Sequence, residues 1–160
     1  MKILIAYYSK TGNTEFVAEK LAEELSRDNT VELKKIELKK PMGVFKGIMD
    51  ARRGKEPEIF DLGISPADYD IVCIGCPIWA FNPHPAFNSF VSQCGSLSGI
   101  KTVVFATHGG MGQKNAIRKM VDRVKNKGAE SVLCADFIVK EKEKTAKEIE
   151  SFARNLLSSF

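Results

Sequence analysis

The sequence predicts a doubly wound α/β fold, in which helices cover both faces of a parallel sheet. Short apolar runs of the length of buried strands alternate with stretches of helical periodicity throughout the 160 residues. This alternation indicates a parallel sheet, because a crossover must carry the chain back before the next parallel strand can begin. No repeat, low-complexity stretch or interdomain linker interrupts the pattern, so we expect one domain over residues 1–160.

The first third of the chain supplies two strands and a helix. Residues 2–8 are an apolar run that suits a buried strand, and residues 14–26 place apolar side chains on one helical stripe. Residues 30–38 alternate apolar residues with lysines, which is typical of an edge strand protected by charge.

The remaining strands and helices follow in the second half. Three more apolar runs predict strands at residues 69–76, 101–106 and 131–139. Gly128 suits the C-terminal end of the helix before the last of these strands. The three helices are marked by apolar residues at helical spacing, namely Phe87, Phe90, Val91 and Cys94, then Ile117, Met120, Val121 and Val124, and finally Ile149, Phe152, Ala153 and Leu156.

Residues 40–64 break this rhythm. Only residues 44–53 have helical character there, with Phe45, Ile48 and Met49 on one side. Long irregular segments inside compact domains are often functional. We expect either a lid over a ligand site or a plain crossover helix, and the apolar side could equally serve a dimer.

Composition excludes several classes of protein. Hydrophobic residues make up 44% and charged residues 28%, which rules out a disordered or collagen-like chain. The net charge of +4 is too small, and the lysines are too mixed with acids, to indicate a nucleic-acid partner. The apolar runs are too short for a membrane span, and residues 1–8 are too short for a signal peptide. With its four cysteines expected to be reduced, we predict a cytoplasmic protein.

Three loops should carry the chemistry, because ligands of open parallel sheets bind beyond the carboxyl ends of the strands. The first loop, residues 9–14, leads from a strand directly into a helix and contains three hydroxyl side chains, an amide and a glycine. The free N–H groups and the positive dipole end of a helix N-terminus favour a phosphate. An ordinary helix cap needs only one such polar residue, so we predict a phosphate site.

This first loop fits none of the common phosphate-cleaving or nucleotide motifs. It contains neither Gly-x-Gly-x-x-Gly nor Gly-x-x-x-x-Gly-Lys-Ser/Thr, the fingerprints of dinucleotide and nucleoside-triphosphate sites. It lacks the cysteine nucleophile of a low-molecular-weight phosphatase, and Cys76-Pro77 stands where a receiver domain would need an aspartate. The loop is suited to holding a phosphate, not to cleaving or accepting one.

The other two loops suit a flat ligand. The second, residues 76–85, is apolar and stiffened by three prolines, and its Trp79 suits stacking on an aromatic ring, although the indole could instead fill the core. The third, residues 107–113, has three glycines whose N–H groups are open to a planar ligand edge. An esterase is excluded, since residues 95–99 have leucine where the nucleophile belongs.

Together, the three loops resemble the flavin loops of the flavodoxin family. Residues 9–14, Ser-Lys-Thr-Gly-Asn-Thr, match the family's phosphate loop at every specified position, and residues 75–83, with Gly-x-Pro-x-Trp and Asn-Pro, resemble the loop that carries the isoalloxazine ring. Residues 106–112 are similar to the third flavin loop, with His108 in place of a serine. The resemblance implies a flavodoxin-like three-layer sandwich with a five-stranded parallel sheet in the order 2-1-3-4-5 and a tightly bound, noncovalent flavin mononucleotide (FMN).

The resemblance also assigns roles to the three loops. It implies that the first loop holds the phosphate, that Trp79 stacks on or flanks the ring, and that the backbone of residues 77–82 and 107–112 bonds the polar edge of the ring. We expect no catalytic residue and no metal ligand. The expected cofactor-binding residues are Ser9, Lys10, Thr11, Gly12, Asn13, Thr14, Pro77, Ile78, Trp79, Ala80, Phe81, Asn82, Thr107, His108, Gly109, Gly110 and Gly112.

Two functions fit this resemblance. An electron carrier would use FMN to shuttle electrons between redox partner proteins, whereas an NAD(P)H-dependent FMN oxidoreductase would reduce quinones or similar small acceptors. We expect the carrier, because the sequence shows no obvious pyridine-nucleotide site. The intact phosphate loop speaks against a third option, an interaction module that has lost its cofactor. We expect no nucleic acid or membrane as partner, and either a monomer or a homodimer.

The chain departs in its charge from the well-studied carriers of this family, which are strongly acidic. Its net charge is +4, and all three loops lack Asp and Glu. Nearby negative charge disfavours the reduced, anionic flavin. We therefore expect a reduction potential less negative than in the acidic carriers, and a preference for different partners.

Two cysteines and two histidines remain to be placed. Residues three apart on a strand point to opposite faces, so Cys73 and Cys76 should be small core residues and neither metal ligands nor a disulfide. His84 should cap the helix that follows it. His108 either gives a proton or a hydrogen bond to the reduced flavin or lies exposed in its glycine-rich turn.

Overall fold

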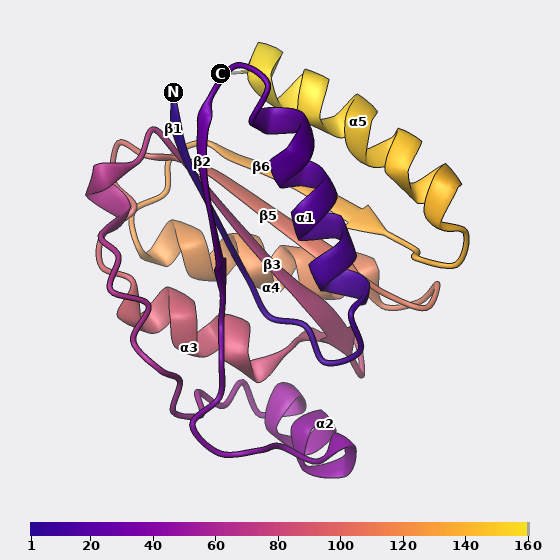
Figure 1. Cartoon of the computed structure of the whole chain (residues 1–160). Coiled ribbons are helices and arrows are strands. Elements are labelled where there is room, and N and C mark those ends of the chain that lie inside the picture. The colour runs from indigo at the N-terminus through magenta and orange to yellow at the C-terminus, as the bar shows by residue number, and fades with distance from the viewer. Residues whose placement is uncertain (160) are drawn as a thin grey trace.

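The computed structural model describes residues 1–159 and contains five parallel strands in the order β2-β1-β3-β5-β6 (Figure 1). A two-residue strand, β4 (Asn82–Pro83), pairs antiparallel with the end of β3. With β4 left aside, this is the predicted order 2-1-3-4-5, which is thus confirmed. The parallel strands are β1 (Lys2–Tyr7), β2 (Thr30–Lys35), β3 (Ile71–Trp79), β5 (Lys101–Thr107) and β6 (Val132–Phe137).

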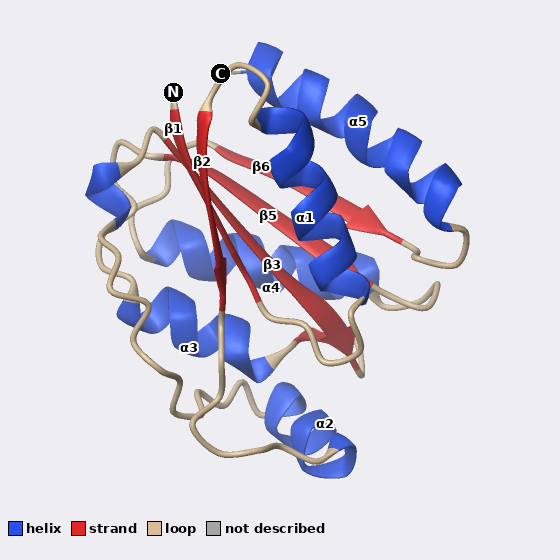
Figure 2. Ribbon diagram, viewed as in Figure 1, coloured by secondary structure: helices blue, strands red, loops and turns tan. Residues whose placement is uncertain are grey.

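Helices cover the sheet in two pairs (Figure 2). On one face lie α1 (Asn13–Leu25) and α5 (Lys142–Ser159), and on the other lie α3 (Pro85–Gln93) and α4 (Gln113–Asn126). The predicted three-layer arrangement is confirmed. Within residues 1–159, none of the helices combines the length and the apolar character needed to cross a membrane.

Alternate residues of the central strands pack into two separate hydrophobic cores, one on each face of the sheet. Leu4 of β1 packs toward α3 and α4, whereas its neighbour Ile5 packs toward α1 and α5. Cys73 and Cys76 of β3 likewise lie in different cores, which confirms that they point to opposite faces. Burial raises the pKa of both thiols to about 12, so they stay protonated and behave as small apolar side chains.

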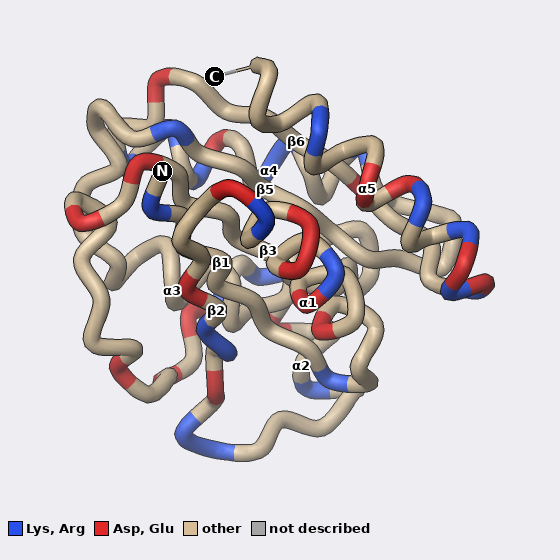
Figure 3. Tube along the Cα trace, turned by 45° about the horizontal axis from the view of Figure 1, so that its top comes forward, with Lys and Arg blue, Asp and Glu red and all other residues tan. Residues whose placement is uncertain are grey.

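Charged residues lie at the edges and on the outer faces of the helices. The edge strand predicted at residues 30–38 is confirmed for Thr30–Lys35, because within residues 1–159 β2 pairs with β1 alone and carries Lys34 and Lys35 on its partly exposed surface. Beyond Lys35 the chain leaves the sheet, and Leu38 forms an isolated bridge with Ile59. Lys and Arg alternate with Asp and Glu over the surface, as along α5 (Figure 3). The alternation of lysines and glutamates over residues 140–144, where α5 begins, is one example of this mixing.

The loop expected at residues 76–85 is partly a hairpin. β3 runs on to Trp79, and the chain turns back through Ala80 and Phe81 into β4. Both turn residues have positive φ, 48° and 66°, as in the tight type I′ turns of hairpins. Such turns usually contain Asn-Gly or Asp-Gly, and prolines count against a strand. The hairpin therefore could not be recognised from the sequence.

Residues 40–64 contain a helix, α2 (Val44–Arg52), close to the predicted bounds 44–53. α2 does not cover a face of the sheet but lies beside the carboxyl end of β3, at the bottom of Figure 1. An antiparallel bridge between Leu38 and Ile59 ties the two ends of the segment together. The segment is thus an ordered crossover, and its helix borders the carboxyl edge of the sheet.

Candidate cofactor site

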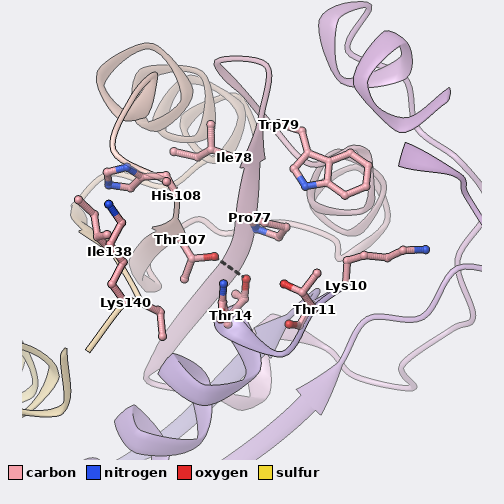
Figure 4. A pocket seen from close by; sticks show the side chains of 14 residues that line it. Lys10, Thr11, Thr14, Pro77, Ile78, Trp79, Thr107, His108, Ile138 and Lys140 are labelled. Carbon is pink, nitrogen blue, oxygen red and sulfur yellow. Dashed lines mark hydrogen bonds between the residues drawn. The ribbon is translucent and has the colours of Figure 1, made fainter. Parts of the chain in front are cut away.

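A cleft of about 290 Å³ opens at the carboxyl ends of the central strands (Figure 4). Parallel sheets of this topology bind ligands at this edge, where the strand order reverses. The three loops that the sequence singled out meet here, and a segment after β6 joins them. The cleft is lined by Ser9, Lys10, Thr11, Asn13, Thr14, Pro77, Ile78, Trp79, Thr107, His108, Gly109, Ile138, Val139 and Lys140.

The loop before α1 presents the N-terminus of that helix to the cleft. Gly12 occupies the N-cap position with φ 91°, a left-handed conformation that strains any residue with a Cβ. Its N–H donates to Ser9 Oγ at 3.1 Å, which fixes the loop while leaving the serine proton free to donate. Within the described chain no side chain caps α1, so its first N–H groups are available to a ligand.

The first and third loops are joined by a buried hydrogen bond. The hydroxyl oxygens of Thr14 and Thr107 lie 2.8 Å apart, and both side chains are almost completely buried. Figure 4 shows this contact as a dashed line at the base of the cleft. Thr11 is exposed on the rim of the same loop, so its hydroxyl can reach a ligand without giving up a buried contact.

The indole of Trp79 forms an apolar wall of the cleft. It is half-buried, so it faces the cleft and does not simply fill the core. The imidazole of His84 meets it edge to face, with ring centroids 4.5 Å apart and planes inclined by 83°. A Cβ on Gly47 of α2 would lie only 2.2 Å from Cζ3 of the indole. The orientation of this wall is therefore set by one histidine and one glycine.

His84 is fully buried and neutral. The predicted helix cap is confirmed, since its Nδ1 accepts a hydrogen bond from the Ala86 N–H at 3.1 Å. Burial, and to a smaller extent the charge of Lys10, lowers the pKa of the imidazole to about 3. The single ring proton must then be on Nε2, which has no hydrogen-bond partner among the described residues.

His108 has both ring nitrogens engaged. Nδ1 accepts from the Gly110 N–H at 3.0 Å, and Nε2 lies 2.8 Å from Oδ2 of Asp136. The side chain is only 2% exposed, so the expectation of an exposed residue is wrong. The Nε2–H group donates its hydrogen bond to Asp136, so neither ring nitrogen is free to bond a ligand directly. Instead, the histidine ties the glycine-rich loop to the end of β6.

Some of the expected cofactor residues build the surroundings of the cleft and do not line it. Ala80 and Phe81 form the hairpin turn, and Asn82 lies buried behind it, where its Nδ2 donates to the Ala80 carbonyl at 2.6 Å. A Cβ on Gly112 would lie 2.6 Å from the ring of Phe81, so this glycine makes room for the hairpin. Among the expected residues, those outside the lining are Gly12, Ala80, Phe81, Asn82, Gly110 and Gly112.

The segment after β6 was not predicted to line the cleft. Ile138, Val139 and Lys140 line the cleft together with the first and third loops. The available signal was positional, because β6 is parallel to β5 and its carboxyl end must reach the same edge. Asp136 was missed for the same reason, although it holds His108 in place.

The chemistry of the lining fits a phosphorylated ligand with a flat ring. The only formal charges contributed by the described lining residues are those of Lys10 and Lys140, and no Asp or Glu is among them. Hydroxyls, an amide and helix N–H groups supply neutral donors around the first loop, which suits phosphate oxygens. Lys10 also donates from Nζ to the Met42 carbonyl at 3.1 Å and so links this loop to the segment that contains α2.

The family model for flavodoxin matches residues 2–148. The chain belongs to the flavodoxin family. This membership and the structural neighbours confirm the family and the fold that the loops suggested, and FMN, the cofactor of that family, fits the donor set and the apolar wall of the cleft. Among curated proteins, none matches the sequence.

Solved structures share the fold of this flavodoxin along nearly its whole length. A candidate flavoprotein from Bacteroides eggerthii is 25% identical, with 98% of each chain covered and a TM-score of 0.73. A flavoprotein from Lactobacillus acidophilus in complex with FMN is 24% identical, with 91% of this chain and 98% of the other covered and a TM-score of 0.66. The flavodoxin of Streptococcus pneumoniae TIGR4 is 16% identical over all of both chains, with a TM-score of 0.68.

Proposed function

We propose that this flavodoxin is an electron carrier that holds FMN without a covalent bond and exchanges electrons with redox partner proteins. The observation that carries the proposal is the cleft itself. It joins an uncapped helix N-terminus surrounded by hydroxyls to an apolar indole wall, and no carboxylate lines it among the described residues. Flavins accept and donate electrons singly or in pairs, which is the chemistry that bound FMN supplies.

The first loop is suited to the phosphate. The hydroxyls of Ser9 and Thr11, the Asn13 amide and the first N–H groups of α1 would donate to its oxygens, and the ammonium of Lys10 would balance part of its charge. The hydroxyl of Thr14 is bonded to Thr107, so its role there is to hold the first and third loops at a fixed separation.

The ring would lie between the second loop, the third loop and the segment after β6. Trp79 supplies a flat apolar surface that is already oriented by His84 and Gly47. Pro77 and Ile78 extend this apolar lining, and Gly109 leaves the third loop without a side chain that would keep the ring away. The chain would thus bind, orient and partly shield the cofactor.

The first experiment is a spectrum of the purified protein after addition of FMN and removal of the excess. We expect two visible flavin bands and a flavin fluorescence that is quenched in the complex and returns on denaturation. A Trp79→Leu variant should retain FMN but quench it less, because the indole is the nearest aromatic wall. A protein that stays colourless would exclude every flavin-dependent function.

The second experiment separates a carrier from an oxidoreductase. The FMN-loaded protein is reduced photochemically and mixed in a stopped-flow instrument with a protein acceptor such as a c-type cytochrome, and its oxidation of NADPH is measured with a soluble quinone. A carrier should pass electrons rapidly to the protein and consume NADPH slowly. Rapid NADPH oxidation with the quinone would instead assign the NAD(P)H-dependent oxidoreductase.

A further inference from the structure

A second cleft, here called the basic groove, lies between the end of α2, the hairpin strand β4 and helices α3 and α4. Its volume is about 440 Å³, and within the described chain it shares no lining residue with the cofactor cleft. The hairpin separates the two, since Ile78 and Trp79 line the cofactor cleft and Asn82 and Pro83 line the groove. The groove is lined by Ala51, Arg52, Arg53, Gly54, Asn82, Pro83, Asn88, Lys119, Asp122, Arg123 and Asn126.

Four cationic side chains from two helices and the turn after α2 converge on this groove. Arg52 and Arg53 come from the end of α2, and Lys119 and Arg123 come from α4, one turn apart. Asp122 is the one carboxylate of the lining. Cations of like sign gathered in one groove repel one another, and an anion bound among them relieves that repulsion.

The four cations differ in how many hydrogen bonds and ion pairs they already make within the chain. Arg123 is anchored, because Nη1 binds Glu56 Oε1 at 2.9 Å and Nη2 donates to the Gly54 carbonyl at 3.1 Å. Lys119 donates to the Asn82 side chain. Arg52 and Arg53 are exposed, so their guanidinium groups can turn toward a ligand at little cost. The groove thus combines two fixed cations with two adaptable ones.

Buried amides form part of the groove wall. Asn82 and Asn88 are only 6% and 1% exposed, so each is held in one orientation. Asn88 Nδ2 donates to the Lys55 carbonyl at 3.2 Å, whereas its Oδ1 has no partner among the described residues. Because the Oδ1 atom of Asn88 is an acceptor without a donor in the described part of the chain, a hydroxyl group of a ligand could donate a hydrogen bond to it. Buried amides beside exposed arginines suit a polar small-molecule ligand better than a plain solvated surface does.

We propose that the basic groove binds a phosphorylated small molecule, whose phosphate oxygens are held by the guanidinium groups of Arg52 and Arg53 beside the anchored Arg123. Planar guanidinium groups pair with phosphate through two parallel hydrogen bonds, which makes arginine a specific phosphate ligand. The site is independent of the proposed electron-carrier function, since none of these residues belongs to the cofactor cleft. It gives this flavodoxin a second ligand next to the hairpin that forms the indole wall.

The test is calorimetric titration of the FMN-loaded protein at low ionic strength with three probes: inorganic pyrophosphate, adenosine diphosphate and adenosine. FMN loading keeps the probes out of the cofactor cleft and is followed by its absorbance. We expect saturable binding of the two phosphorylated probes and none of adenosine. The double variant R52S/R53S should weaken that binding about tenfold or more, because it removes both adaptable cations.

The matched control removes the same charge from the opposite face. Arg27 follows α1 and Arg154 lies on α5, and both are exposed and paired with glutamates. R27S/R154S should leave the affinity for pyrophosphate within about twofold of the parent protein, since these arginines belong to the α1 and α5 side of the sheet and the groove to the α3 and α4 side, and each is already paired with a glutamate. Binding that both double variants weaken equally, or no saturable binding below a few millimolar, would overturn the proposal.

A failure of FMN loading would not obscure the result. The titration can then be repeated on the FMN-free protein with an added T11V substitution in the cofactor loop. Pyrophosphate binding that T11V abolishes and R52S/R53S leaves intact would place the anion in the cofactor cleft and contradict the basic groove. The opposite pattern would support the groove while the electron-carrier proposal fails.

Discussion

The imidazole of His84 stacks on the phenol ring of Tyr8, with ring centroids 4.0 Å apart and planes inclined by 15°. The same imidazole meets Trp79 edge to face, so one buried histidine connects the end of β1 to the wall of the cofactor cleft. Stacked and edge-to-face aromatic pairs each contribute about 0.5–1.5 kcal/mol beyond their buried area. A charged imidazole would be destabilised here, because it is buried, because a proton on Nδ1 would replace the hydrogen bond from the Ala86 N–H, and because Lys10 repels the positive charge.

The neutral state of His84 predicts how the stability of the protein depends on pH. Its pKa is about 3 in the folded protein and near 6.5 in the unfolded chain. Between these values the unfolded chain binds one more proton than the folded protein, so the free energy of unfolding falls as the pH falls from 6.5 toward 3. The slope from this residue approaches about 1.4 kcal/mol per pH unit.

Urea titrations at pH 5, 6 and 7.5 measure this slope. H84N keeps a side-chain acceptor for the Ala86 N–H but has no titratable ring. It should be less stable than the parent at pH 7.5, because the aromatic contacts are lost, yet its stability should depend less on pH between 5 and 6.5. Equal slopes in the two proteins would show that His84 titrates normally in the folded state.

Gly47 should be intolerant of any side chain. A Cβ there would approach Cζ3 of Trp79 to 2.2 Å and Sδ of Met42 to 3.1 Å, so G47A must displace α2 or the indole. Overpacking costs about 1–3 kcal/mol, which exceeds the gain of up to about 1 kcal/mol in helix propensity. We expect a lower thermal midpoint, a shifted Trp79 emission and weaker FMN binding.

G43A is the matched control for G47A. Gly43 precedes α2 with φ −69°, a conformation open to any residue, and a Cβ there would meet nothing within 4 Å. Its thermal midpoint, tryptophan emission and FMN affinity should all stay close to those of the parent protein. If G43A perturbs Trp79 as strongly as G47A does, the close contact between α2 and the indole is not what orients the wall.

The two hydroxyls at the start of the phosphate loop should behave differently. Thr11 is exposed and lines the cleft, so T11V should weaken FMN binding while leaving the stability of the FMN-free protein unchanged. S9A also removes the acceptor of the Gly12 N–H, so it should lower both the affinity for FMN and the stability of the FMN-free protein. Loss of one hydrogen bond to a charged group costs about 1.5–3 kcal/mol, which corresponds to roughly 10- to 150-fold in the dissociation constant of FMN.

Fluorescence titration with FMN and urea unfolding of the FMN-free proteins distinguish these two effects. T102S, a conservative change on a buried strand away from the cleft, serves as the control for general loss of packing. A normal FMN affinity in T11V would mean that this hydroxyl does not take part in holding the phosphate.

The tautomer of His108 is fixed by its two neighbours. Because Nδ1 accepts from the Gly110 N–H, the neutral ring must carry its proton on Nε2, facing Asp136. The ¹⁵N shifts of the neutral imidazole should therefore report the Nε2–H tautomer. D136N retains an acceptor and should keep this tautomer, whereas D136A should allow exchange and broaden the amide signals of Gly109 and Gly110. A dominant Nδ1–H form in the parent protein would contradict the assigned contacts.

The charges around the cleft predict a reduction potential less negative than in acidic carriers of the family. Lys10 and Lys140 line the cleft, and no described carboxylate does. Positive charge stabilises the reduced, anionic cofactor. Replacing the exposed Lys140 by glutamate should lower the potential by roughly tens of millivolts, an effect that salt screens. Redox titration at low and high ionic strength measures it, and a potential in the parent as low as in acidic carriers would refute the prediction.

Much of the fold could be predicted because it depends on patterns within single segments. The helix over residues 14–26, the glycine at position 128 and the opposite facing of Cys73 and Cys76 all follow from local periodicity and glycine conformation. The topological rule for parallel sheets then brought the three loops to one edge. The hairpin at Ala80 and Phe81 could not be predicted, since its positive φ values are imposed on residues that carry no turn signal.

The doubly wound fold, the family of this flavodoxin and the loop of residues 9–14 that we propose for the phosphate could all be predicted from the sequence, because apolar periodicity and a contiguous motif are properties of residues that are neighbours in the chain. The burial of His84 against Trp79, the contact of Asp136 with His108 and the groove shared by Arg52 and Arg123 became visible only in the folded chain. These relationships join residues that are far apart in the chain or in different elements. Burial, pKa and charge clustering depend on such distances in space, which a one-dimensional pattern does not contain.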